Sequence, residues 1–255
     1  MSKPVALVTG ASSGIGRELA RVLAAQGYDL VIVARRYERL TELASELSPQ
    51  HGTAVRLIKA DLCDPSAPDR IMAELDQANL PIDVLINDAG LGRTDSFAQM
   101  AWPDIESQIS VNIIALTHLT RLLLPGMISR KHGRILNVGS IAGYLPGPGM
   151  AIYYATKAFV FSLSEALWQE THGTGVTVAV LCPGLTHTEF HQQAHQSVGR
   201  FGWMSAASVA RIGYQAMITG RRVVNAGGLN TLIAGILRLV PHRILLMAGK
   251  VARRR

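Results

Sequence analysis

Short apolar runs alternate with longer amphipathic segments along most of the chain. Six runs have the length and composition of buried strands, and segments of helical length lie between them. The predicted strands cover Val5–Gly10, Leu30–Ala34, Val55–Ala60, Asp83–Gly90, Gly133–Ser140 and Val176–Gly184. This alternation predicts an α/β fold, a Rossmann-like doubly wound parallel sheet with helices on both faces. Gly227 and Gly228 precede a further strand or helix, so a seventh strand stays undecided.

The length of 255 residues suits one domain, large enough to bury a continuous sheet between two helical layers. The chain has no internal repeat, low-complexity tract or linker. We divide the domain, residues 1–255, into a motif-bearing core (1–188), a substrate lid with the helix after it (189–220) and a basic C-terminal extension (221–255). Two cysteines are too few for a disulfide framework, and the N-terminus lacks the apolar core of a signal peptide. We therefore expect a cytoplasmic protein.

Positive charge is concentrated at the C-terminus. The formal net charge is +7, but residues 221–255 carry eight basic side chains and no acid, so residues 1–220 sum to −1. A nucleic-acid-binding protein more often spreads basic residues over a face with interleaved aromatic residues, whereas this segment is aliphatic. We therefore expect no nucleic-acid partner.

The basic segment also contains two apolar stretches, one interrupted by Arg238 and both bounded by Pro241. Spanning a bilayer takes about 20 consecutive apolar residues, and neither stretch is that long. Two alternatives remain for the chain from about Leu229 onward, both outside the active site. Its helices lie on an anionic membrane surface, or its apolar positions pack on the sheet or on a second subunit.

A glycine-rich turn follows the first predicted strand. Its spacing, T-G-x-x-x-G-x-G, is formed by Thr9, Gly10, Gly14 and Gly16, and the helix after it ends at Gly27. Glycines let the backbone turn sharply and approach a pyrophosphate, while free N–H groups at the helix start can donate to it. Because the motif joins a strand to a helix, it indicates a dinucleotide site rather than an ordinary turn.

Tyr153 and Lys157 are four residues apart, so on a helix they share one face. The ammonium group of the lysine is expected to favour the phenolate and thereby lower the pKa of Tyr153. Ser140 precedes the tyrosine by thirteen residues, in NVGSIAG. The set predicts a proton donor and acceptor that works at a carbonyl group.

The end of the second predicted strand bears on the choice of coenzyme. A residue that reads a ribose 2′-hydroxyl there would be Asp or Glu, but the strand ends in Ala34, followed by Arg35 and Arg36. The fixed fork of a guanidinium group suits a 2′-phosphate, so we predict NADP(H) rather than NAD(H). The alternative is that both arginines only solvate the start of the next helix.

Taken together, these segments resemble the short-chain dehydrogenase/reductase family in its single-domain branch. The resemblance covers Val5 to about Thr188. It rests on TGASSGIG, the acid Asp61 after the third strand, NDAG from Asn87 to Gly90, Asn112 in SVNIIAL, Ser140 in GSIAG, Tyr153 with Lys157, and Pro183 with Gly184 in LCPGLTHT. One departure is Asp88, where the family commonly has a second asparagine. We expect it to alter local strand bonding more than chemistry.

The resemblance implies four catalytic residues: Ser140, Tyr153, Lys157 and Asn112. In the reductive direction a hydride leaves the nicotinamide and Tyr153 gives a proton to the carbonyl oxygen, to which Ser140 hydrogen-bonds. Lys157 would also hold the nicotinamide ribose. Asn112 would position a water that links the lysine to solvent as a proton relay.

The resemblance also implies a coenzyme site along the strand ends. Asp61 would accept a hydrogen bond from the adenine amine, and Asn87, Ala89 and Gly90 would line the adenosine ribose. Thr188 would meet the carboxamide, with a helix cap as its alternative role. The whole predicted coenzyme set is Gly10, Ser12, Ser13, Gly14, Ile15, Gly16, Arg35, Arg36, Asp61, Leu62, Asn87, Ala89, Gly90, Tyr153, Lys157, Pro183, Gly184, Thr186 and Thr188.

The segment after Gly184 resembles the mobile substrate-covering segment of the family. Thr186 and Glu189 form a helix-start capping box, and His187, His191 and His195 would then share one face. Three imidazoles could hold zinc, but the family's chemistry needs no metal. We therefore expect a half-exposed lid helix without a metal site, from which one histidine could touch substrate.

The sequence thus predicts an NADP-dependent short-chain dehydrogenase/reductase that transfers a hydride between NADP(H) and a carbonyl or secondary alcohol. Phe190, Phe201, Trp203 and Met204 in the lid region favour an apolar small-molecule substrate, although they could equally be core residues. The alternative is an NADPH-binding sensor or scaffold protein without turnover. We expect a homodimer or homotetramer, with peripheral membrane contact through the C-terminal segment as the alternative stated above.

Overall fold

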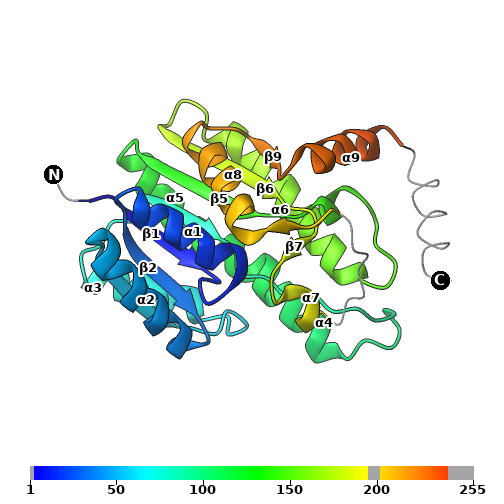
Figure 1. Cartoon of the computed structure of the whole chain (residues 1–255), viewed down its shortest axis with the longest axis horizontal. Helices are drawn as coiled ribbons and strands as arrows, with labels where there is room; N and C mark the ends of the chain where they lie inside the picture. The colour runs from blue at the N-terminus through cyan, green and yellow to red at the C-terminus, as the bar shows by residue number, and fades with distance from the viewer. Residues whose placement is uncertain (1–2, 195–201, 241–255) are drawn as a thin grey trace.

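The computed structural model describes residues 3–194 and 202–240. Its centre is a seven-stranded parallel sheet in the order β3-β2-β1-β4-β5-β6-β9, between two layers of helices (Figure 1). The strands are β1 (Val5–Thr9), β2 (Asp29–Ala34), β3 (Val55–Lys59), β4 (Val84–Asn87), β5 (Gly133–Val138), β6 (Val176–Cys182) and β9 (Val223–Asn225). The predicted doubly wound α/β fold is therefore confirmed.

The central strands are buried along their whole length, because helices cover both faces of the sheet. Every residue of β1 and of β4 is buried, and Ala6 of β1 is in register with Val84 of β4. Successive side chains of a strand point to opposite faces, so Ala6 joins one core cluster and Leu7 joins the other. The strands appear as continuous apolar runs in the sequence because helices cover both faces of the sheet.

Two helical layers provide that cover. One layer consists of α1 (Gly14–Ala25), α2 (Tyr37–His51) and α8 (Ala206–Ile218). The other contains α3 (Ala67–Gln77), α4 (Trp102–Ile109), a π-helical turn η1 (Ser110–Ala115), α5 (Leu116–Ser129) and α6 (Ala151–Glu170), with a 3-10 turn η2 (Ile141–Tyr144) before α6. In α1, Leu19 and Leu23 are buried four residues apart, the helical spacing that turns one face to the sheet.

The chain reverses its direction of winding at β1. Strands β2 and β3 lie on one side of it, and β4, β5, β6 and β9 lie on the other. The connections after β1 and β4 diverge at this point, which leaves a crevice at the carboxyl ends of the strands. The glycine-rich turn follows β1, Asp88 follows β4, Ser140 lies after β5 and Pro183 follows β6. Motifs far apart in the sequence therefore meet at one edge of the sheet.

The first part of the predicted C-terminal extension, residues 221–240, packs on the sheet, which is one of the alternatives that the sequence left open. Strand β9 pairs in parallel with β6, so it is the seventh strand, and the segment after Gly227 is helix α9 (Gly228–Leu239). Asn230 of α9 packs on the loop after β6, since a Cβ added at Gly184 would lie 2.5 Å from Asn230 Oδ1. The rest of the predicted extension, residues 241–255, lies outside the described residues.

One helical stretch in the described part of the chain, Trp102–Ser129, is long and apolar enough to cross a membrane by length and composition alone. It comprises α4, η1 and α5. Its residues Leu119, Leu123 and Met127 are buried in the core cluster that also contains Leu7 of β1. The apolar composition is therefore explained by packing against the sheet.

Candidate active site

The glycine-rich turn and Asp88 form one wall of the crevice. Gly10 and Gly14 have φ angles of 73° and 60°, in the left-handed region that glycine adopts without strain. The Asp88 carboxylate packs against the turn, because a Cβ added at Gly16 would lie 2.5 Å from Asp88 Oδ2. The main-chain N–H of Gly16 donates to this carboxylate. Position 16 therefore needs glycine in order to leave room for Asp88.

Asp88 is bonded to the first strand and lies in the electrostatic environment of Lys157. Its main-chain N–H does donate to Thr9 Oγ1 (3.1 Å), which is part of the local strand bonding. However, burial raises the pKa of its carboxyl group to about 7, while the positive charge of Lys157 and the Gly16 N–H act in the opposite direction. The Asp88 carboxylate is thus coupled electrostatically to Lys157, and the expectation that Asp88 alters local strand bonding more than chemistry stays a prediction.

Ser140, Tyr153 and Lys157 lie on one cavity wall, formed by α6 and the segment after β5. Tyr153 and Lys157 are one helical turn apart, with Lys157 Nζ 5.9 Å from the centroid of the Tyr153 ring. Lys157 Nζ donates to the carbonyl oxygen of Val138 (2.8 Å), which fixes the ammonium group at the end of β5. Ser140 Oγ accepts from the Ala142 N–H (3.1 Å) at the start of η2. The structure thus brings these three predicted residues together.

Burial dominates the pKa values of this group. Although the Tyr153 side chain is partly exposed to the cavity, desolvation raises the pKa of the phenol to about 12, and the hydrogen bond with Ser140 acts in the opposite direction. Desolvation likewise lowers the pKa of Lys157 to about 8, against the charge of Asp88, which raises it. The pKa of Tyr153 is therefore raised, not lowered as predicted, because the cost of burying a phenolate is larger than the effect of the Ser140 hydrogen bond.

Asn112 lies on the π-helical turn η1 and is 1% exposed. Its Oδ1 accepts from the Leu91 N–H (2.8 Å), and its Nδ2 donates to the Leu91 carbonyl oxygen (2.8 Å) and to Thr156 Oγ1 (2.9 Å). These bonds tie the loop after β4 to helix α6. The side chain therefore positions the main chain next to Gly90, and its part in a water relay stays a prediction. A π-helical turn often marks a functional site.

Asn87 does not reach the crevice. It is the last residue of β4, and its Nδ2 donates to Thr120 Oγ1 (3.1 Å) and to Asn137 Oδ1 (2.9 Å) inside the fold. Ala89 and Gly90 line the crevice instead. The side chain of Asn87 therefore points between the sheet and α5, and the prediction that Asn87 lines the adenosine ribose stays a prediction.

A hollow of about 180 Å³ lies at the carboxyl ends of β1, β2 and β3, where the adenosine half of a dinucleotide is predicted. The residues predicted for that half gather here, and they include Ser12, Ser13, Arg35, Arg36, Asp61, Leu62, Ala89 and Gly90. Asp61 also accepts a hydrogen bond from the Cys63 N–H (3.0 Å) through Oδ1. The fold thus brings the residues of the predicted adenosine site together from four separate segments of the chain.

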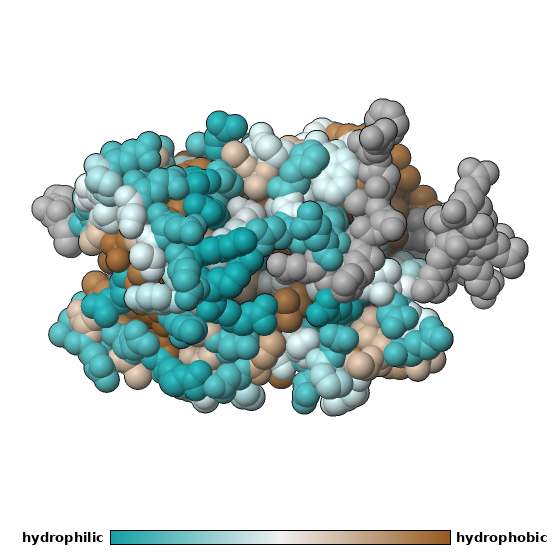
Figure 2. Space-filling model, turned by 60° about the horizontal axis from the view of Figure 1, so that its bottom comes forward, coloured by the Kyte–Doolittle hydropathy of each residue, from teal (hydrophilic) through white to brown (hydrophobic). Residues whose placement is uncertain are grey.

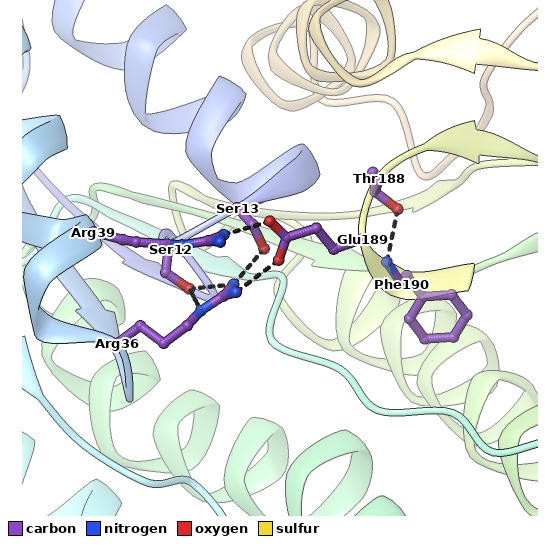
Figure 3. Close-up of polar contacts among 7 residues, drawn as sticks. All are labelled: Ser12, Ser13, Arg36, Arg39, Thr188, Glu189 and Phe190. Carbon is purple, nitrogen blue, oxygen red and sulfur yellow. Dashed lines mark hydrogen bonds and ion pairs between the residues drawn. The ribbon is translucent and has the colours of Figure 1, made fainter. Parts of the chain in front are cut away.

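Arg36 and Arg39 each pair with one oxygen of the Glu189 carboxylate (Figure 3). Arg36 Nη1 donates to Glu189 Oε2 (2.6 Å), and Arg39 donates to the other carboxylate oxygen. The Arg36 Nη2 atom donates to Ser13 Oγ (2.8 Å) and Ser12 Oγ (3.1 Å) of the glycine-rich turn. Sequence reasoning missed Arg39, although its position three residues after Arg36 on the same helix was a usable signal.

The main cavity, of about 420 Å³, extends from the glycine-rich turn past Tyr153. Most of the predicted coenzyme set lines it: Gly10, Ser13, Gly14, Ile15, Ala89, Gly90, Tyr153, Lys157, Pro183, Gly184, Thr186 and Thr188. Its far end is mainly apolar and includes Phe190, whose ring packs on Tyr153 with centroids 5.1 Å apart. Ile233 and Leu237 of α9 also line it. The expectation that the C-terminal segment stays outside the active site is therefore wrong.

The covering segment contains less helix than predicted. Thr186 and His187 form strand β7, which pairs with β8 (Met204–Ser205), and helix α7 covers only Phe190–Gln193. The capping box does not form, because the Glu189 carboxylate pairs with the two arginines instead of a main-chain N–H. Two of the three histidines contact the Trp203 ring: His187 is stacked on it at 4.8 Å, and His191 is edge-on at 4.7 Å.

His195 and Phe201 lie outside the described residues. Within residues 3–194 and 202–240, no group of three or more His, Cys, Asp or Glu side chains is arranged to hold a metal ion. The expectation that the protein uses no metal stays a prediction. Of the lid residues taken as signs of an apolar substrate, Phe190 lines the cavity, whereas Met204 packs against the core.

The chain is similar to a family of oxidoreductases. The sequence profile of the short chain dehydrogenase family matches residues 4–199. The NADP-dependent 3-hydroxy acid dehydrogenase of Escherichia coli (strain K12) is 40% identical over 188 residues, which cover 73% of this chain and 74% of the relative.

Two solved structures share the whole architecture. A short-chain dehydrogenase from Sphingobium yanoikuyae, solved in complex with NADPH, has a TM-score of 0.83 at 33% identity, covering 93% of this chain and 96% of that one. The bulky-bulky ketone specific alcohol dehydrogenase from Comamonas testosteroni has a TM-score of 0.79 at 29% identity, covering 94% and 96%. Our predictions of an oxidoreductase and of NADP(H) as coenzyme are confirmed at the level of these relatives. The chain belongs to the short-chain dehydrogenase family.

Proposed function

We propose that the protein transfers a hydride between NADP(H) and an uncharged, apolar ketone or the corresponding secondary alcohol. The observation that carries this proposal is the meeting of Ser140, Tyr153 and Lys157 in one cavity beside the glycine-rich turn. With a pKa of about 12, the Tyr153 phenol is protonated at neutral pH and can donate its proton to a carbonyl oxygen. The Ser140 hydroxyl can hydrogen-bond the same oxygen as its negative charge grows. The coenzyme, when bound, supplies the hydride.

The residues present fit NADP(H). Gly10 and Gly14 let the main chain approach a pyrophosphate, and the N-terminus of α1 offers unpaired N–H groups to it. Arg35 and Arg36 line the adenosine hollow at the end of β2, where a guanidinium group can pair with a 2′-phosphate. Thr188 lines the main cavity and is proposed to meet the carboxamide.

The lining of the cavity favours an uncharged substrate. Beyond Tyr153 it is formed mainly by Leu145, Leu185, Phe190, Ile233 and Leu237. Among the described residues that line it, Lys157 is the single lysine or arginine, and its ammonium group already donates to Val138. A buried carboxylate or sulfonate needs a cation of its own. The ketone specificity named for the Comamonas testosteroni relative is therefore a closer match than the 3-hydroxy acid of the Escherichia coli relative.

A substrate panel tests this proposal and separates it from a sensor or scaffold role. Purified protein is mixed with NADPH and with a bulky aryl ketone, a cyclic ketone, a 3-oxo acid or a short aldehyde, and NADPH absorbance is followed. We expect the highest kcat/KM with the bulky ketones, and oxidation of NADPH about 10²- to 10⁴-fold slower by the Tyr153→Phe variant. Turnover of the 3-oxo acid alone would contradict the substrate class. Absence of turnover with every compound, together with tight NADPH binding, would support the sensor.

We also propose that the protein is a cytoplasmic homodimer or homotetramer. Its association would use an apolar contact through α9. Leu229, Leu232 and Ile236 are 59%, 62% and 51% exposed, and their spacing places them on one side of the helix. Most of the face in Figure 2 is hydrophilic, and a group of hydrophobic residues lies near its right-hand end. This face of α9 suits a second subunit or an anionic membrane surface, as the sequence predicted.

A further inference from the structure

Glu189 lies where three parts of the site meet: helix α2, the glycine-rich turn and the covering segment (Figure 3). Its carboxylate is shared between Arg36 and Arg39, and this pairing lowers its pKa, so it is ionised at neutral pH. The three side chains are 36–38% exposed. Ion pairs at such exposure compete with water and exchange readily. The contact is therefore specific but easily opened.

The partners of Glu189 form an anion site. Arg36 and Arg39 present N–H donors, and the hydroxyl groups of Ser12 and Ser13 complete the arrangement around Arg36. Arg36, Ser12 and Ser13 also line the adenosine hollow. A phosphate group carries more charge and more acceptor oxygens than one carboxylate, so it can replace Glu189 on Arg36, whereas a neutral hydroxyl group cannot.

The neighbours of Glu189 in the chain both line the catalytic cavity. Thr188 packs on the glycine-rich turn, since a Cβ added at Gly14 would lie 3.1 Å from Thr188 Cγ2. Phe190 packs on the catalytic Tyr153. With Glu189 held by the arginines, Thr188 and Phe190 are held over the turn and over the phenol. Release of the carboxylate therefore frees the segment that covers both.

We propose that Glu189 is a specificity-determining residue for the coenzyme: its carboxylate occupies the anion site on Arg36 until a 2′-phosphate displaces it and thereby releases the covering segment. A ribose with a free 2′-hydroxyl leaves the carboxylate in place. Discrimination between the two coenzymes is then coupled to opening of the site. This inference rests on the proposed use of NADP(H).

Nucleotide fragments test the inference without turnover. Adenosine 2′,5′-bisphosphate carries the 2′-phosphate and 5′-AMP lacks it, and calorimetry gives the Kd of each for wild-type protein and for Glu189→Gln. Removing an internal competitor raises the population of the open arginine site, so the variant should bind the bisphosphate about three- to tenfold more tightly. Its Kd for 5′-AMP should change less than twofold. Glu189→Asp, which retains the charge, should stay closer to wild type.

Glu18→Gln is the matched control. Glu18 lines the same surface hollow as Glu189 and Arg39 but pairs with Arg21, so its loss removes one negative charge without touching the anion site. Weaker binding of the bisphosphate by Glu189→Gln would overturn the inference, because Glu189 would then position Arg36 for the phosphate. Equal tightening for both nucleotides, or the same effect in Glu18→Gln, would overturn it as a general charge effect. If wild type does not prefer the bisphosphate, the assignment of NADP(H) fails instead.

Hydrogen exchange gives a second readout. In wild-type protein, amides of residues 186–194 should exchange faster with the bisphosphate bound than with 5′-AMP bound. In Glu189→Gln they should exchange fast with either nucleotide. Slower exchange of this segment with the bisphosphate than with 5′-AMP would contradict release.

Discussion

The catalytic wall and the segment that covers it are held by different kinds of interaction. Lys157 and Asn112 are 6% and 1% exposed and are fixed by hydrogen bonds to the main chain. Glu189, which anchors the covering segment, is held by half-exposed ion pairs that screening weakens. The groups that we propose for the chemistry are thus preorganised, while those that we propose for coenzyme selection are free to exchange. Substitutions in the catalytic wall should therefore change kcat. Substitutions among the arginines and Glu189 at the rim of the cavity should change the selection between NADPH and NADH.

The largest effect is expected from Tyr153→Phe. Removing the proton donor should lower kcat for carbonyl reduction by about 10²- to 10⁴-fold, because proton transfer from a positioned side chain contributes that much. The Kd for NADPH should change less than twofold, since only the hydroxyl group is lost. Steady-state kinetics and fluorescence titration measure the two quantities. A kcat within threefold of wild type would remove Tyr153 from the mechanism.

Arg35→Ala, a change in the adenosine hollow, should affect only the selection between NADPH and NADH. A charge-assisted hydrogen bond is worth about 1.5–3 kcal/mol, so the Kd for NADPH should rise about tenfold or more while that for NADH changes less than threefold. Arg56→Ala is the control, because Arg56 is exposed on β3 and lines no part of the adenosine hollow. An equal loss for both coenzymes would mean that Arg35 does not read the 2′-phosphate.

Asp88→Asn should change the pH dependence of the reaction. The lysine is charged below its pKa of about 8, so reduction that needs this charge declines as pH rises through that value. The negative charge of Asp88 raises the pKa of Lys157, and its removal should move the alkaline limb of kcat/KM to lower pH. Glu165 lies on the same helix as Lys157 but pairs with Arg222. Glu165→Gln should therefore leave the alkaline limb of kcat/KM in place. An unchanged limb in Asp88→Asn would contradict the coupling.

The smallest effect is expected on α9. Replacing Leu229, Leu232 and Ile236 together with Ser leaves the cavity residues Ile233 and Leu237 in place. We expect weaker sedimentation with anionic vesicles, with a salt dependence, or a smaller oligomer by light scattering. Ile128→Ser, at a 38% exposed position on α5, is the control. If neither vesicle binding nor oligomer size changes, α9 has no part in association.

Local patterns predicted the sheet and the ends of its strands, because apolar runs and glycine turns depend on neighbouring residues. The pairing of Tyr153 with Lys157 was predictable for the same reason, since one helix fixes it. The pKa of Tyr153 was not, because it depends on burial by segments from the whole chain. Glu189 was assigned to a capping box with Thr186, whereas its partner Arg36 lies 153 positions away. The side chain of Asn87 points into the fold, because side chains alternate between the two faces of a strand, and this direction was not predicted.

The strand order has a consequence for how the protein is made. After β1, β2 and β3 extend the sheet on one side, and β4, β5, β6 and β9 are then added on the other side in the order in which the ribosome delivers them. Each new strand covers the open edge left by the previous one, and an open edge is an aggregation hazard. Strand β9, the last one among the described residues, is followed by α9, whose Ile233 and Leu237 line the cavity. A growing chain therefore completes its active site only after its final strand has docked.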